Sequence, residues 1–108
     1  MDHFIAVNLW ENTVDLYTEE EFLEHTGSKP LEESDYESLS DRIEELLENN
    51  DCKVAWCRDD AIGLILDEIE VLSTEDGDGE QIIDLAKMII RIAENNYWDL
   101  IIDRNRGL

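Results

Sequence analysis

The sequence predicts a small α+β domain with a strongly acidic surface. We expect a mainly antiparallel sheet, formed by an N-terminal hairpin and two further strands, packed with three to four helices. Alternating strand-like segments and helix-like segments follow one another irregularly along the 108 residues, which favours α+β over parallel α/β architecture. The hydrophobic content of 43% supports a packed core despite a formal net charge of −21. We therefore expect one folded domain over residues 1–108 and not a disordered chain.

The N-terminal segment predicts a β-hairpin. From His3 to Trp10, apolar side chains fall on both faces of an extended segment. The polar pair at 11–12 interrupts this run, and alternation resumes through Val14 and Leu16. Two such runs separated by two polar residues are typical of a hairpin. We expect the three tryptophans of the chain, Trp10 included, to be buried in the core.

Two capping patterns predict the next two helices. Thr18 precedes a glutamate by three residues, which is the spacing of a capping box, and Gly27 can end the helix that it opens. Ser34 and Glu37 repeat the pattern. Apolar residues then recur at helical spacing. The segment 36–48 is the clearest helix of the sequence.

Residues 52–57 predict a strand with Val54 and Trp56 directed inward. Cys52 and Cys57 stand five residues apart on it. An odd spacing sends strand side chains to opposite faces, so we expect no disulfide between them. We interpret Cys52 and Cys57 as two buried thiols in a reducing cytosol. A single pair of cysteines without further Cys or His ligands does not make a zinc site.

The second half of the chain predicts two helices and a last strand. Residues 61–72 favour a helix, with a strand that pairs back as the alternative. An acidic loop follows at 74–79. Residues 80–95 carry apolar side chains around most of the helix circumference, so we expect this helix to be central. Residues 97–102 have the aromatic and β-branched content of a strand, and 103–108 form a tail.

The negative charge is concentrated in two segments. Residues 15–51 carry a net charge of −12 and residues 59–84 carry −10, whereas residues 85–108 carry +1. Self-repulsion at this level costs stability, so we infer that a basic partner uses the field. A merely solvated acidic face is the alternative. Halophilic adaptation is disfavoured because the C-terminal quarter is nearly balanced.

The predicted helix at 36–48 carries an acidic ridge. Its acidic residues stand three and four positions apart, opposite the apolar stripe. Like charges at this spacing weaken an isolated helix by about 0.2–0.5 kcal/mol per pair, so folding alone does not favour them. Four residues of helix rise about 6 Å, which is of the same order as the phosphate spacing along one DNA strand. The ridge can therefore imitate a row of phosphates.

In charge density and size the chain resembles phage-encoded DNA-mimic inhibitors as a class. The resemblance implies a protein that blocks the basic nucleic-acid-binding site of a host DNA-binding or defence protein, such as a restriction enzyme or a CRISPR effector. Its carboxylates would pair with lysines and arginines of that target, without a cofactor and without binding nucleic acid directly. A homodimer would lengthen the acidic rows and is left open. The predicted contact residues are Glu19, Glu20, Glu21, Glu24, Glu37, Asp41, Glu44, Glu45, Glu48, Asp67, Glu68, Glu70, Glu75, Asp76 and Asp78.

We expect no enzymatic activity and no catalytic residues. His3 lies at the terminus and His25 in a glutamate-rich helix, where it is expected to be a surface residue, and neither lies near a glycine-flanked Ser or Cys motif. The sequence has no glycine-rich phosphate loop. The acidic field would repel nucleotides and nucleic acids.

Two segments resemble known metal-binding patterns, but we expect no metal site. The loop at 74–80 has the aspartate spacing of a calcium loop, but both terminal ligands are missing. Residues 44–48, with Glu75 and Asp78, resemble the EExxE and ExxD elements of the all-helical MazG-like nucleotide pyrophosphatases. The predicted strands depart from that fold.

A second class of function uses the same electrostatics. An immunity protein or antitoxin would mask the basic active site of one cognate nuclease toxin. Exposed aromatic residues, such as Tyr36 or Trp10, would favour this dedicated interface. The N-terminus lacks the basic head and apolar run of a secretory signal, and no segment has the length of a membrane span. We therefore expect a cytoplasmic protein, in the host cytoplasm if it is phage-encoded, with no membrane partner.

Overall fold

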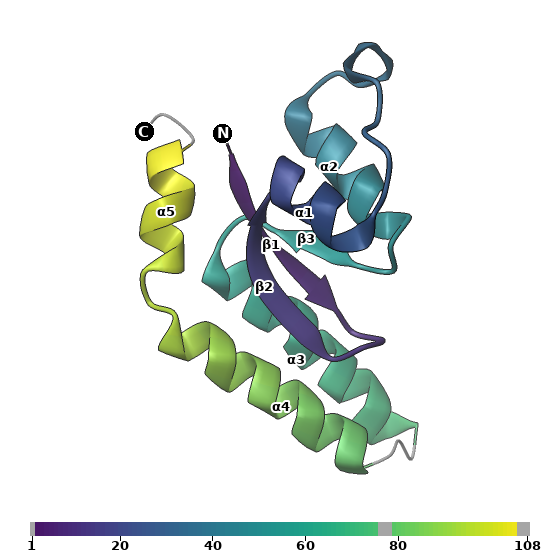
Figure 1. Ribbon diagram of the computed structural model, residues 1–108. Helices are drawn as coiled ribbons and strands as arrows, with labels where there is room; N and C mark the ends of the chain where they lie inside the picture. Colours follow the sequence, from purple (N-terminus) through teal and green to yellow (C-terminus); the bar gives the residue numbers. More distant parts are fainter. Residues whose placement is uncertain (1, 76–78, 106–108) are drawn as a thin grey trace.

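The computed structural model describes residues 2–75 and 79–105. Over these ranges a three-stranded antiparallel sheet lies between two layers of helices (Figure 1). The α+β class expected from the sequence is confirmed, with one strand beyond the hairpin where two were expected and with five α-helices in the described ranges. The elements in chain order are β1 (His3–Asn8), β2 (Thr13–Thr18), α1 (Glu19–Thr26), the 3₁₀ helix η1 (Glu33–Asp35), α2 (Leu39–Glu48), β3 (Lys53–Ala55), α3 (Arg58–Thr74), α4 (Gly79–Glu94) and α5 (Trp98–Asn105).

The central strand β1 is buried on both faces. It pairs antiparallel with β2 on one side and with β3 on the other. Phe4 and Ala6 point toward α1 and α2, whereas Ile5 and Val7 point toward α3, α4 and α5. All four side chains are at most 5% exposed. This explains why apolar residues occupy both faces of the predicted strand instead of alternating with polar ones.

Two separate half-cores result from this arrangement. The α1/α2 half-core is the cluster on the β1 face that bears Phe4, and the α3–α5 half-core is the cluster on the face that bears Ile5. The buried residues of the α1/α2 half-core are Phe4, Ala6, Phe22, Ile43, Leu46, Leu47 and Cys52. Those of the α3–α5 half-core are Ile5, Val7, Val14, Ala55, Ala61, Ile65, Leu85, Met88, Ile92, Trp98 and Ile102.

The hairpin turn places Trp10 in solvent. The side-chain oxygen of Asn8 accepts hydrogen bonds from the backbone N–H groups of Trp10 and Glu11, at 2.9 and 2.8 Å, and this ends β1 two residues earlier than expected. Because Trp10 lies in the turn and not on a strand face, 85% of its surface is exposed. The expectation that Trp10 is a core residue was wrong.

Of the two predicted helix N-caps, the one at Thr18 is confirmed and the one at Ser34 is wrong. Thr18 caps α1 by accepting from the N–H of Glu21, and Gly27 ends the helix with φ of 69°, as predicted. For α2 the cap is Ser38, which accepts from the N–H of Asp41 at 3.2 Å, whereas Ser34 lies in η1. The helix therefore begins at Leu39 and not at 36.

The ambiguous segment at 61–72 is helical and belongs to α3. The cap of α3 is Cys57, whose sulfur accepts from the N–H of Asp60 at 3.4 Å. Cys57 is half-buried, not fully buried as expected, and both cysteines are free thiols. The strand predicted at 52–57 is shorter in the structure, β3 (Lys53–Ala55), so Trp56 follows it. Val54 and Trp56 are half-buried against the α1/α2 half-core.

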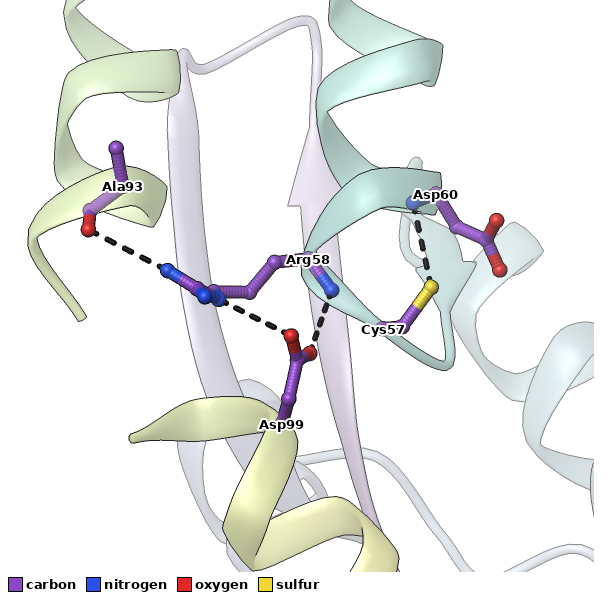
Figure 2. A network of polar contacts seen from close by, with 5 residues as sticks. All are labelled: Cys57, Arg58, Asp60, Ala93 and Asp99. Atoms are coloured by element: carbon purple, nitrogen blue, oxygen red, sulfur yellow. Dashed lines mark hydrogen bonds and ion pairs between the residues drawn. The ribbon is translucent and has the colours of Figure 1, made fainter. Parts of the chain in front are cut away.

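The predicted C-terminal strand is a helix. Residues 97–102 were expected to extend the sheet, but α5 packs on the core through Trp98 and Ile102, which stand one helical turn apart. Figure 2 shows the contact that fixes it: the Asp99 carboxylate accepts from the backbone N and from Nε of Arg58, at 2.8 and 3.2 Å. The same guanidinium donates to the carbonyl oxygen of Ala93 at 3.4 Å, so one arginine joins α3, α4 and α5.

Helix α4 lies at the periphery of the molecule and not at its centre (Figure 1). Leu85, Met88 and Ile92 are its buried residues, while Ile83 and Ile90 are each 56% exposed. The expectation of a central helix was therefore wrong. In the described ranges, no helix combines the length and the apolar character needed to cross a membrane.

Candidate partner-binding surface

The outer face of α2 carries a row of carboxylates. Asp41, Glu44, Glu45 and Glu48 are all exposed and stand three and four residues apart. Ile43, Leu46 and Leu47 are buried on the opposite face. The predicted ridge is therefore present over these four residues, because the apolar stripe that anchors the helix sets the direction of the other face. Glu37 is exposed but precedes the helix, so it does not continue the row.

The one basic residue in the α2 sequence is turned away from this row. Arg42 donates to Glu19 at 2.5 Å and to Glu33 at 2.9 Å, and its side chain is only 11% exposed. The hydrogen bond that Arg42 donates to the Glu19 carboxylate raises the pKa of Arg42, so the guanidinium stays charged. Its charge is matched within the molecule by two carboxylates. The outer face of α2 is thus acidic without interruption.

Helix α1 contributes a second acidic group to the same layer. Glu20, Glu21 and Glu24 are exposed on it. The first two lie in the opening turn, where the helix dipole favours negative charge, so they also have a structural role. The pair between Arg42 and Glu19 joins α1 to α2. Glu19, although predicted to contact a partner, is therefore bound within the molecule.

The predicted contact residues at 67–75 lie on α3 and at its C-cap. Asp67 and Glu70 are exposed on α3, Glu68 is half-buried, and Glu75 is exposed at the C-cap. The sheet separates α3 from α1 and α2 (Figure 1), so Asp67, Glu70 and Glu75 belong to the layer opposite the α2 row. Glu68 lines the same hollow as Glu48 of the α2 row. Two further predicted contact residues, Asp76 and Asp78, lie outside the described residues.

A groove of about 510 Å³ lies beside α1 and α2. Apolar side chains in its wall include Leu23, Pro30 and Leu39, and carboxylates in its lining include Glu20 and Glu33. This combination fits a lysine or arginine, whose aliphatic stem needs apolar surface and whose charged end needs a carboxylate. Arg42 also lines the groove and already pairs with Glu33, so Glu20 is a groove carboxylate that Arg42 does not engage.

Sequence reasoning missed the position of Trp10. Besides being exposed, Trp10 lines two hollows, one of about 270 Å³ that also contains His25 and Asp51, and one of about 610 Å³. The available signal was its place directly before the polar break at Glu11. Tyr36, the other aromatic residue considered for an interface, is half-buried, and burial together with a hydrogen bond to Glu45 raises its pKa.

In the described ranges, no group of three His, Cys, Asp or Glu side chains could hold a metal ion. His25 is exposed, as expected, and its ring lies 5.4 Å from that of Tyr17. The considered calcium loop falls partly outside the described residues. The sheet also distinguishes this fold from an all-helical pyrophosphatase.

Comparison with protein families, with curated proteins and with solved structures finds no match to this chain. The most distinctive features of its surface are the acidic row on α2, the neighbouring glutamates of α1 and the exposed Trp10.

Proposed function

We propose that this protein is a DNA-mimic inhibitor, which occupies the basic nucleic-acid-binding site of a DNA-binding or defence protein. The observation that carries the proposal is the uninterrupted acidic row on α2, from Asp41 to Glu48, with Arg42 turned inward. Its three- and four-residue steps rise about 4.5–6 Å along the helix axis, of the same order as the phosphate spacing of a DNA strand.

On this proposal the protein inhibits its target by occupying the nucleic-acid-binding site, without catalysing a reaction. Lysines and arginines of the target pair with the carboxylates of α1 and α2, as they would with phosphates. A net charge of −21 steers the two proteins together. Binding therefore weakens as salt rises, and duplex DNA competes for the same site.

The test begins with capture of the target from bacterial lysate and continues with purified proteins. We expect duplex DNA and the inhibitor to exclude one another from the target, with affinity falling as salt increases. The α2 variant Glu44→Lys/Glu48→Lys should lose most of its affinity. The matched control is Asp67→Lys/Glu70→Lys, which changes the net charge equally but lies in the opposite layer, and it should keep most of the affinity.

Equal losses in the two variants would show that net charge, and not the α2 row, governs binding. A target that binds DNA and this protein simultaneously would rule out mimicry. Both variants replace exposed side chains, so circular dichroism and thermal melting should match the parent protein and exclude unfolding as the cause.

The exposed Trp10 favours a second candidate function, an immunity protein or antitoxin that masks one nuclease toxin. Dedicated interfaces concentrate their binding energy in buried aromatic anchors, and a tryptophan that is 85% exposed in the free protein is suited to that role. Trp10→Ala should then weaken binding by about 30-fold or more. For a DNA mimic the loss should be small. Tyr97→Ala, which truncates another exposed aromatic residue, is the control.

A further inference from the structure

Helix α4 carries a stripe of exposed apolar side chains. Ile83 and Ile90 stand seven residues apart and are each 56% exposed. Ala86 and Ala93, three residues after each isoleucine, are exposed as well. The spacing places all four on one side of the helix, opposite the buried Met88. This α4 stripe, defined by these two isoleucines and two alanines, therefore lies on the helix face opposite the one that packs on the core.

One positive and one negative charge flank the α4 stripe. Lys87 and Glu94 follow Ile83 and Ile90 by four residues each, so they lie along the same edge of the stripe. Both are exposed, and in the part of the chain that the structure describes neither makes an ion pair. The other cation of the helix, Arg91, is already engaged by Asp15 and by the carbonyl oxygen of Val14.

The surrounding charge decides which partner fits the stripe. Helix α4, Gly79–Glu94, carries three acidic residues against Lys87 and Arg91, a net charge of −1, whereas α3 carries −4 and residues 15–51 carry −12. Two copies of a chain with charge −21 repel one another, and the repulsion is weaker at α4 than at the more acidic helices. A strongly basic target would instead be drawn to the acidic layers. The stripe thus fits a second copy of this chain.

We propose that two copies associate through α4, packed antiparallel about a twofold axis near Ile90. In this orientation Lys87 of one copy lies opposite Glu94 of the second copy, and the reverse pair forms by symmetry. In a parallel twofold pairing the edge that bears Lys87 and Glu94 would face the opposite edge of the second helix, so this pair would not form. The exposed alanines leave room for the isoleucines of the facing helix.

The dimer leaves the proposed inhibitory surface open. Helices α1 and α2 lie on the other side of the sheet from α4. One copy can therefore bind its target and a second copy of the chain at the same time. The interface is small, and the net charges repel, so association should be weak, concentration-dependent and stronger at high salt. Target binding on the proposed function has the opposite salt dependence, which separates the two proposals.

Sedimentation of the purified full chain, at protein concentrations up to about 1 mM and in low and high salt, tests the dimer. The wild type should pass from monomer to dimer as concentration rises. Ile83→Ser/Ile90→Ser should raise the dissociation constant at least tenfold. The matched control is Leu66→Ser/Val71→Ser, which removes two exposed apolar residues from α3 and should behave as the wild type.

Charge exchange tests the orientation. Glu94→Lys reduces the net charge from −21 to −19, so it would strengthen any association limited by general repulsion. In the antiparallel dimer the new lysine at position 94 of each copy instead lies opposite Lys87 of the other copy. These two repulsive contacts should raise the dissociation constant about fivefold. Lys87→Glu/Glu94→Lys exchanges the pair and should restore the wild-type constant.

Three results would overturn the proposal. The first is a wild type that stays monomeric over the whole concentration range, and the second is a Glu94→Lys variant that associates more tightly than the wild type. The third is an Ile83→Ser/Ile90→Ser variant that sediments as the wild type but loses its target, which would assign the stripe to that target. Circular dichroism of every variant checks that the monomer is folded.

Discussion

At the scale of single residues, Arg42 connects the two helices of the candidate surface. Arg42→Ala leaves Glu19, whose side chain is 19% exposed, without its cation. Losing this charged, partly buried contact should lower the free energy of unfolding by about 2 kcal/mol. Urea denaturation followed by circular dichroism measures the change.

The control for this substitution is Lys53→Ala, which removes an exposed cation from β3. Its effect should stay within about 0.5 kcal/mol, as for most surface substitutions. Equal effects of the two substitutions would mean that the Arg42 contacts contribute no more than an average surface charge.

The two thiols make stability depend on pH. Burial raises the pKa of Cys52, and also that of Cys57, above the ordinary value of 9.0. In the folded state the thiols keep their protons at a pH where the unfolded chain releases them, so unfolding is favoured as pH rises above about 9. The free energy of unfolding, measured from about pH 7 to 10, should fall at the alkaline end. Cys52→Ala should flatten this fall, and an unchanged profile would contradict the assignment.

How far the candidate surface was predictable differs from residue to residue. The direction of Glu44 and Glu48 followed from the apolar stripe, because helical spacing is a local property. The inward turn of Arg42 did not, since it depends on Glu19, which is 23 positions away in the sequence. Trp10 was misjudged because hydrophobicity alone does not show where a turn begins.

At the scale of elements, the start of α2 separates two similar serines. Ser38→Ala removes the hydroxyl that accepts from the N–H of Asp41 and should cost about 1 kcal/mol. Ser34→Ala changes the residue that the sequence pattern predicted as the cap. It should change the free energy of unfolding by less than about 0.5 kcal/mol. The midpoints of urea denaturation report both. The reverse order would place the start of the helix at the earlier serine.

The two capping patterns show why element boundaries were only partly predictable. Thr18 and Ser34 both precede a glutamate by three residues, yet only Thr18 caps an α-helix. The difference comes from the buried residues that follow. Phe22 lies on the first turns of α1, whereas the buried apolar residues of α2 begin at Ile43, too late for a cap at Ser34.

The error at α5 has a tertiary cause. Trp98, Ile101 and Ile102 are residue types common in strands. Burial of Trp98 and Ile102 on one helical face, together with the contact of Asp99 with Arg58, favours the helix instead. Because Arg58 precedes Asp99 by 41 residues, local propensity did not reveal this contact.

At the scale of the whole molecule, the net charge sets the response to salt. Carboxylates on α1, α2 and α3 repel one another in the folded state, and salt screens that repulsion. Raising sodium chloride from about 0.02 M to about 0.5 M should raise the melting temperature by about 5 °C. Asp67→Asn/Glu70→Asn, which reduces the net charge to −19, should show a smaller rise. A melting temperature that falls with salt would contradict this account.

The burial of β1 on both faces determines how the molecule unfolds. Both half-cores pack against the same strand, β1. Phe4 and Ala6 belong to the α1/α2 half-core, and Ile5 and Val7 belong to the α3–α5 half-core. Losing either helical layer exposes one face of the strand that the other layer requires, so the two layers should unfold together. Amide protons of β1 should therefore exchange with solvent only through global unfolding, whereas those of α1 exchange earlier by fraying. The single strand shared by both layers makes this three-layer protein one cooperative unit.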